Sequence, residues 1–316
     1  MSKTSKALLI GGIILVVGLV IGLIGFALSG FKFEGLSTTN SVTNTYDVTE
    51  SFENISIDVD TDDIYFLPSA DGKCRVVCQE SEKTFHQVSV TDKTLTITII
   101  NERSYTDFFG TKMTVTVYLP GKAYSRLDIH CSTGDVQIPA DFTFNSLAVN
   151  ASTGDVDCKA SAGKIQITLS TGQITLSDIS SDEISLETTT GRIEVNSVTC
   201  SGGITANVRT GKTVLKDVSC KKLVSTGTTG DANLKNVIAK ESFSIERSTG
   251  DVSFDGCDAP EIYVKTSTGE VSGTLLSEKV FLVESHTGDI DVPKTTTGGT
   301  CTIETDTGDI EITIKK

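Results

Sequence analysis

The chain has 316 residues, enough for one or two domains with a hydrophobic core. It has no Trp, only 5 Pro and 2 Met, and its many Thr, Ser, Ile, Val and Gly residues favour strands and turns over helices. The formal net charge is −14, and an acidic surface repels nucleic acid and anionic lipid. Nucleic-acid binding is therefore excluded as an expected function.

The N-terminal region contains one long apolar stretch. Residues 7–28 form a run of 22 positions without a charged side chain, about the length that a helix needs to cross a bilayer core of about 30 Å. We predict a single transmembrane helix here, anchoring the chain in the cell membrane after a cytoplasmic tail at residues 1–6. Lys3 and Lys6 favour a cytoplasmic N-terminus and an extracellular C-terminal domain. A cleaved signal peptide is the alternative, although its apolar region is usually only about 7–15 residues long.

Residues 29–125 lie between the apolar stretch and a set of repeats. We expect residues 29–45 to be a linker, because they are rich in Ser, Thr and Asn. Residues 46–125 contain runs that alternate apolar and polar side chains, such as residues 113–119, bounded by turn residues. We interpret them as an N-terminal β cap that continues into the repeats and covers their first edge. A separate small β sandwich is the alternative.

A repeat organises the chain over residues 126–316. Glycines recur there at intervals of 18–20 residues, and each of them follows a Thr. So regular a Thr-Gly step indicates one structural unit per interval. We expect each Gly to form the corner of a coil, because Gly adopts positive φ at little steric cost. These corner glycines are Gly134, Gly154, Gly172, Gly191, Gly211, Gly230, Gly250, Gly269, Gly288 and Gly308.

Apolar residues fall at fixed distances from the corners. They recur two and four positions after the Gly and five and seven before it, as Ile174, Leu176, Ile167 and Ile165 do around Gly172. A spacing of two is the strand period, and it leaves no helical stripe. One such unit cannot bury its apolar side alone, whereas coils stacked about 4.8 Å apart can. The predicted fold is an all-β single-stranded β-helix, a β-solenoid of about ten coils preceded by one transmembrane α-helix.

The last strand of the sequence is expected to form the C-terminal edge of this stack. Residues 310–314 alternate Ile with polar side chains, and Lys315 and Lys316 follow. Lysines at an edge discourage further strand pairing, so they would close the rod weakly.

An acidic residue follows most corner glycines. Asp commonly accepts hydrogen bonds from backbone N–H groups in turns, which gives these residues a structural role. The alternative is calcium binding, because carboxylates stacked about 4.8 Å apart repel one another unless they are paired or metal-bound. Arg192 and Lys212 interrupt the column, which favours the structural role. The calcium candidates are Asp135, Asp155, Asp231, Asp251, Asp289 and Asp309.

The 8 Cys residues include no CxxC pair, which argues against zinc-ribbon and thioredoxin-type sites. Cys200 and Cys220 both lie nine residues after their corner Gly, so they stack in adjacent coils at a separation that allows a disulfide. Cys158 and Cys301 occupy inward apolar columns and are expected to be buried free thiols. We expect at most one disulfide, between Cys200 and Cys220.

No catalytic motif is visible in the sequence. His86, His130 and His286 have no Cys or His at metal-ligand spacing, and GxSxG, HExxH and P-loop motifs are absent. Coils of nearly constant length leave no long loops to wall a cleft. We therefore expect a protein without enzymatic activity and without a cofactor. A β-helical enzyme acting on polysaccharides is the minor alternative.

The repeats resemble those of a known family, over roughly residues 50–316. The chain is similar to the bacterial putative-adhesin family, a domain of unknown function built from β-strand repeats. This resemblance implies a β-helical fold, commonly on a membrane anchor in Gram-positive bacteria and sometimes beside envelope-stress genes. It implies no catalytic or binding residues. The resemblance rests on Val117–Pro120, on the STGDV segment Ser132–Val136 and on its copies at Ser152–Val156, Ser248–Val252 and Ser267–Val271.

Three functions are compatible with these observations. The first is a membrane-anchored, adhesin-like module that acts as an extracellular surface-interaction or scaffold protein, with a protein or cell-wall partner on one face of the solenoid. The second is an envelope-stress accessory or sensing protein at the cell membrane. The third is a structural spacer.

Overall fold

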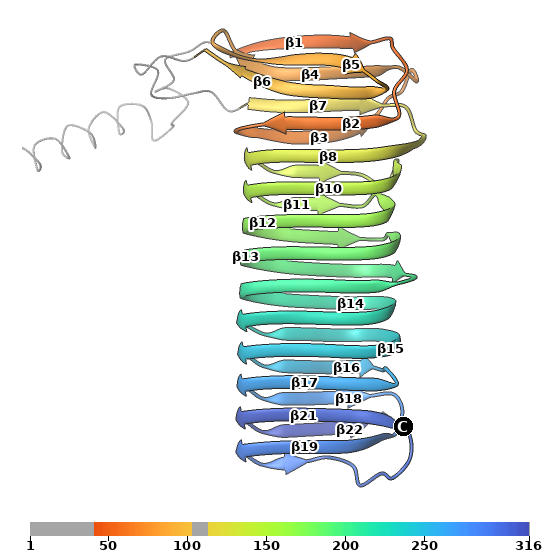
Figure 1. The fold of residues 1–316 in the computed structure, drawn as a ribbon, viewed down its shortest axis with the longest axis vertical. Coiled ribbons are helices and arrows are strands. Elements are labelled where there is room, and N and C mark those ends of the chain that lie inside the picture. Colours follow the sequence, from red (N-terminus) through yellow and green to blue (C-terminus); the bar gives the residue numbers. More distant parts are fainter. Residues whose placement is uncertain (1–40, 103–112, 316) are drawn as a thin grey trace, which may run out of the picture.

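The computed structural model describes residues 41–102 and 113–315. These residues are all-β and form a solenoid of about nine turns, in which 22 strands belong to one continuous sheet (Figure 1). The predicted transmembrane helix at residues 7–28 lies outside the described residues. Within the described ranges, no helix is long and apolar enough to cross a membrane.

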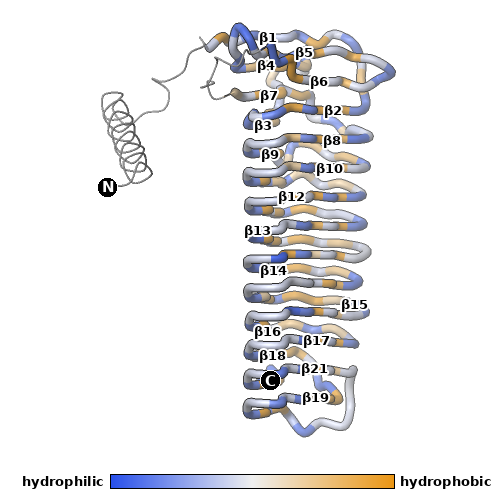
Figure 2. The backbone as a smooth tube through the Cα atoms, turned by 60° about the vertical axis from the view of Figure 1, so that its left-hand side comes forward, coloured by the Kyte–Doolittle hydropathy of each residue, from blue (hydrophilic) through white to orange (hydrophobic). Residues whose placement is uncertain are grey.

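The body of the solenoid is a stack of parallel strands in register. Leu147 pairs with Leu127 on one side and with Ile165 on the other, so like side chains form ladders through the core. Alternation along each strand sends one set of side chains inward and the next outward. In Figure 2, hydrophobic and hydrophilic positions both recur along the coils. The strands of the body are β8 (Ala123–Thr133), β9 (Val136–Ile138), β10 (Thr143–Thr153), β11 (Val156–Cys158), β12 (Ser161–Ser177), β13 (Ser180–Cys200), β14 (Gly203–Thr229), β15 (Ala232–Thr249), β16 (Val252–Cys257), β17 (Glu261–Thr268) and β18 (Val271–Leu275).

The Thr-Gly corners need Gly for two reasons. Nine of the ten corner glycines have φ between 119° and 151°, a conformation that is open almost only to Gly. Each corner also lies directly on the backbone of the adjacent coil. A Cβ added to any of the ten would come within 1.7–2.3 Å of a backbone carbonyl oxygen there. The periodic Gly is therefore required by stacking as well as by the turn.

The C-terminal coils do not stack in chain order. After β18 the chain forms β19 (Lys279–Thr287) and β20 (Ile290–Asp291), then returns to form β21 (Gly299–Thr307) and β22 (Ile310–Ile314). β21 pairs with both β17 and β19, and β22 pairs with both β18 and β20. The last coil of the sequence is thus inserted between two earlier ones (Figure 1). The expectation that residues 310–314 form the terminal edge is wrong.

The N-terminal cap joins the body through its first coil. β2 (Asn54–Val59) and β3 (Asp62–Pro68) pair in parallel with β8 and β9 of the body and with β6 (Thr94–Asn101) and β7 (Met113–Leu119) of the cap. Here too, a coil formed by an early segment of the chain lies between coils formed by later segments. Antiparallel strands then cover the end: β1 (Ser41–Val48), β4 (Cys74–Ser81) and β5 (Thr84–Thr91). β1 begins inside the stretch expected to be a linker.

The first coil differs from the others at its corner. Gly134 lies over the carbonyl oxygen of Asp62, 2.0 Å from the position of an added Cβ, as later corners lie over glycines. Thr61, Asp62 and Asp63 therefore occupy the places of Thr, Gly and Asp in this coil. Asp62 does not have positive φ, and its side chain is fully buried.

Candidate functional site

The acidic column forms a hydrogen-bond ladder along the outside of the corners. Asp135 Oδ1 accepts the backbone N–H of Asp155 at 2.9 Å, and Asp155 Oδ1 accepts that of Gln173 at 2.8 Å. Asp231, Asp251 and Asp309 accept the N–H groups of Asp251, Glu270 and Asp289 in the same way. Where the column is interrupted, Lys212 pairs with Asp231 at 2.8 Å. These contacts give the aspartates a structural role between adjacent coils, beyond the N–H groups of their own turns, and calcium binding stays a prediction.

The cysteines are packed as small apolar side chains. Cys200 and Cys220 are buried and both are free thiols, so the disulfide considered for them is not formed. The Cys200 thiol instead faces the carbonyl oxygens of Asp182 and Gly203, at 3.6 and 3.4 Å. Cys158 and Cys301 are also buried and free, and burial raises the pKa of each thiol to about 12.

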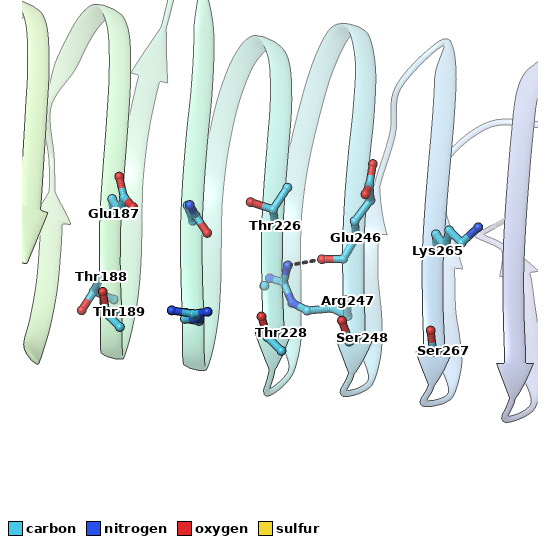
Figure 3. A pocket seen from close by; sticks show the side chains of 13 residues that line it. Glu187, Thr188, Thr189, Thr226, Thr228, Glu246, Arg247, Ser248, Lys265 and Ser267 are labelled. Carbon is cyan, nitrogen blue, oxygen red and sulfur yellow. Dashed lines mark hydrogen bonds between the residues drawn. The ribbon is translucent and has the colours of Figure 1, made fainter. Parts of the chain in front are cut away.

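A polar groove of about 550 Å³ crosses one face of the solenoid (Figure 3). Its lining comes from strands β13, β14, β15 and β17, always from the four residues before the corner. Coil register places these residues side by side in five successive coils, which spans about 19 Å at a spacing of about 4.8 Å. The lining side chains that carry charge are Glu187, Arg209, Glu246, Arg247 and Lys265, and most of the others are hydroxyls.

One coil beneath the groove has no side chain at an inward position. Gly227 stands in register with Arg247 of the next coil, and an added Cβ would lie 3.2 Å from Arg247 Cδ and 2.6 Å from the carbonyl oxygen of Val208. The Arg247 side chain fills the space that Gly227 leaves. In Figure 3 its guanidinium lies beside the coil of Thr226 and Thr228.

Arg247 is a buried cation held by neutral groups. Only 5% of the residue is exposed. Its Nη2 donates to Thr213 Oγ1 at 3.0 Å and to Ser225 Oγ at 2.8 Å, and its Nη1 donates to the carbonyl oxygen of Glu246 at 2.8 Å. Among the described residues no carboxylate forms an ion pair with it. Burial lowers the pKa of Arg247 to about 10, against the opposing charge of Asp231.

The coil that receives Arg247 departs from the apolar pattern. Thr213 and Ser225 are fully buried at positions where the other coils carry apolar residues, mostly Val or Ile, and Gly227 replaces a side chain. A buried charge without a counterion is destabilising. The hydroxyls of Thr213 and Ser225 and the space at Gly227 together accommodate the Arg247 guanidinium. Arg209 and Lys265 line the same groove in other coils, and Lys265 also pairs with Glu304 of β21 at 3.2 Å.

Sequence reasoning did not find this groove. In the sequence, Thr213 and Ser225 stand at inward apolar positions, Gly227 lacks a side chain, and Arg247 occupies an inward column of the next coil. Each looks like a single irregularity in the repeat. Only the coil register brings the four together.

Comparisons with known proteins concern the fold and the family. The family model described as Toastrack DUF4097 matches residues 52–212 and 201–316. Similar solved structures include a protein named a putative adhesin from Bacteroides fragilis, with 17% identity over 87% of this chain and 97% of that chain and a TM-score of 0.44. Another is named a putative lipid binding protein from Parabacteroides distasonis, with 16% identity over 74% of this chain and 97% of that chain and a TM-score of 0.46.

A further solved structure, named a putative adhesin from Parabacteroides merdae, shares 14% identity over 74% of this chain and 97% of that chain, with a TM-score of 0.45. No curated protein matches the chain. The family model covers both the cap and the solenoid, from residue 52 to the last residue. The resemblance drawn from the Thr-Gly copies is thereby confirmed. The chain belongs to the Toastrack DUF4097 family.

Proposed function

We propose that this protein is a non-catalytic interaction module of the bacterial cell surface, and that its groove binds an extended anionic polymer. Although the chain as a whole is acidic, the lining of the groove carries three cations against two carboxylates. The observation that carries the proposal is Arg247, a buried guanidinium without a carboxylate partner among the described residues, beneath a hollow in the outer face. Burial strengthens the attraction between this charge and an anion in the groove, because the local dielectric constant is low.

The shape and lining of the groove support an extended ligand. Arg209 and Lys265 lie in different coils on either side of the coil of Gly227, so successive anionic groups along one chain can meet successive cations. The hydroxyls of Thr226, Thr228 and Ser248 offer hydrogen bonds between them. No aromatic side chain lines the groove, so recognition would depend on charge and hydrogen bonding and not on sugar stacking.

The groove also lacks the geometry of a glycosidase. Its two carboxylates, Glu187 and Glu246, lie three coils apart, which is about 14 Å at about 4.8 Å per coil. Hydrolysis of a glycosidic bond by a carboxylate pair requires a separation of about 5–9.5 Å. This argues for binding without cleavage and against the polysaccharide-active alternative.

The location is the second part of the proposal. A helix over residues 7–28 would hold the solenoid at the outer face of the cell membrane, with the cap nearest the lipid. The support is the uncharged 22-residue stretch and the basic residues before it. Protease treatment of intact cells tests this part, since an outward solenoid is cut from its anchor and an inward one is protected.

A titration of the full chain in detergent with polygalacturonate tests the groove. Dextran is the neutral control polymer. The pair Arg209→Gln and Lys265→Gln should weaken binding by about tenfold or more, because two charged contacts are lost. The pair Lys216→Gln and Lys235→Gln removes the same charge outside the groove and should leave affinity unchanged. Equal binding of dextran, or equal losses in the two double variants, would overturn the proposal.

A further inference from the structure

A second cluster of polar side chains lies inside the cap, away from the groove. Cys78, Glu80 and His86 are each at most 2% exposed. Their potential ligand atoms, one from each side chain, all lie within 4.8 Å of one another. Asp62, from the corner of the first coil, faces the same imidazole. Neither the groove nor the proposed function uses these residues.

Strand geometry explains why these residues meet. Cys78 and Glu80 are two positions apart on β4, so their side chains point to the same face. The chain turns back directly after them, with Ser81 paired to Thr84, and β5 carries His86 toward the same interior. In the linear sequence Cys78 lies eight positions before His86, outside the usual metal-ligand spacings, and the β4–β5 turn brings the two side chains together.

Glu80 holds His86 in a fixed orientation. Its Oε2 accepts the backbone N–H of His86 at 2.6 Å and lies 2.8 Å from His86 Nδ1. Its Oε1 accepts hydrogen bonds from Tyr46 Oη at 3.1 Å and from Asn44 Nδ2. The carboxylate therefore makes four contacts, two of them with His86, which fix the orientation of the imidazole.

Within the described part of the chain, the buried carboxylate of Asp62 lacks hydrogen-bond partners. Its Oδ1 lies 3.1 Å from His86 Nε2, yet neither Asp62 carboxylate oxygen nor His86 Nε2 has a hydrogen bond of good geometry. Asp62 is fully buried. Buried polar atoms are nearly always satisfied, so exceptions point to a missing ligand or ion. Among the described corners, Asp62 takes the place that Gly takes at the ten Thr-Gly corners, so this corner alone carries a side chain.

We propose that the cap binds one zinc ion through Cys78, Glu80 and His86. Thiolate, imidazole and carboxylate are the ligand types that zinc takes in proteins. Tetrahedral zinc with bonds of about 2.0–2.3 Å places its ligand atoms about 3.3–3.8 Å apart, a small adjustment of the present cluster. Three protein ligands leave one coordination position for water.

Asp62 then has a defined role beside the metal. A histidine that ligates through one ring nitrogen usually donates the other N–H to a carboxylate, which fixes its tautomer. With Nδ1 on the zinc, Nε2 would donate to Asp62. Zinc binds the thiolate form of Cys and the neutral form of His, so metal uptake releases protons.

The first experiment uses the wild-type full chain in detergent. The protein is stripped with a chelator under reducing conditions and then titrated with zinc alone. We expect one zinc per chain and a higher melting temperature of the cap. Cobalt(II) in place of zinc should give thiolate-to-metal charge-transfer absorption and the visible bands of a tetrahedral site. These signals do not depend on any variant folding correctly.

Variants then assign the ligands. Cys78→Ala should abolish the charge-transfer absorption and stoichiometric binding, whereas Cys158→Ala removes an equally buried thiol from the solenoid and should leave both unchanged. His86→Gln should also lose binding. His286→Gln is its control, because exposed His286 lies near Glu284 and Asp306 without a thiol. Asp62→Asn should weaken zinc binding by about 10–100-fold, the usual cost of losing a carboxylate behind a ligating histidine.

Two results would overturn the proposal. One is a wild-type chain that takes up no stoichiometric zinc and shows no cobalt–thiolate absorption. The other is a folded Cys78→Ala variant that binds zinc as the wild type does. Neither result bears on the groove, whose binding is measured with the polymer.

Discussion

The solenoid body and the N-terminal cap differ in the residues that they accommodate at the corner of a coil. In the body, every corner lies against the carbonyl of a neighbouring coil, so a side chain there would collide with backbone. In the first coil, Asp62 takes the corner position with an ordinary φ and directs a carboxylate into the cap. Among the described corners, a side chain is therefore accommodated only in the first coil, where the repetition ends.

The two ends of the rod differ as well. Antiparallel strands β1, β4 and β5 cover the N-terminal end. At the other end the outermost coil is formed by β19 and β20, where Leu282 is 57% exposed and Ile290 45% exposed. The inserted coil of β21 and β22 is the better buried of the two, with Cys301 and Ile310 inaccessible to solvent. Chain order therefore does not indicate which coil is the edge.

The largest expected effect comes from deleting residues 300–316. If these residues formed the terminal coil, their loss would leave the rest intact. Because they lie between β17–β18 and β19–β20, their removal should also release residues 279–291. The shortened chain should match the melting temperature of a chain ending at residue 275, and hydrogen exchange should show residues 279–291 unprotected. Protection of those residues would contradict the inserted order.

A Cβ at a corner of the body should cost more than one at a turn of the cap. Gly211→Ala would place Cβ 1.7 Å from the carbonyl oxygen of Gly191, so we expect a loss of about 3 kcal/mol or more in the free energy of unfolding. Gly72 in the cap also has positive φ but meets nothing within 4 Å. Gly72→Ala should cost only about 1–2 kcal/mol. Denaturant unfolding measures both, and equal losses would mean that φ alone requires the corner Gly.

The acidic ladder should contribute modestly and without calcium. Asp155→Ala removes the acceptor of the Gln173 N–H group, at 2.8 Å, and should cost about 0.5–1.5 kcal/mol. Asp141→Ala, at an exposed site outside the ladder, is the control and should be neutral. Addition of millimolar calcium to chelator-treated protein should leave the melting temperature of the solenoid unchanged. A calcium-dependent rise that Asp155→Ala abolishes would restore the metal-binding alternative.

The smallest expected effect is a surface ion pair that reports coil order. Lys265 and Glu304 lie 3.2 Å apart on exposed faces of β17 and β21, and such pairs contribute about 0–1 kcal/mol. A double-mutant cycle with Lys265→Gln and Glu304→Gln should show a small coupling that salt removes. Stacking in chain order would place Glu284 beside Lys265 instead. Coupling to Glu284 and none to Glu304 would refute the inserted coil.

Much of the body could be predicted because its pattern is local and repeated. The Thr-Gly spacing and the apolar columns around Gly172 are set by strand alternation and coil length, which the linear sequence displays directly. The inward thiols Cys158 and Cys301 followed from the same register. The coil order at the C-terminus could not be predicted, because the intervals from Gly269 to Gly288 and from Gly288 to Gly308 have the same length as any other.

The sites escaped prediction because they depend on which coil lies beside which. The Arg247 side chain occupies the space that Gly227 leaves and donates to the hydroxyl of Thr213, 34 residues away. In the proposed zinc site, the β4–β5 turn brings His86 close to Cys78, and the corner of the first coil places Asp62 beside them. The sequence by itself determined the strands, the corners and the family. The tertiary structure decided coil order and brought these side chains together, because contacts across a stack depend on register between distant segments and not on local period.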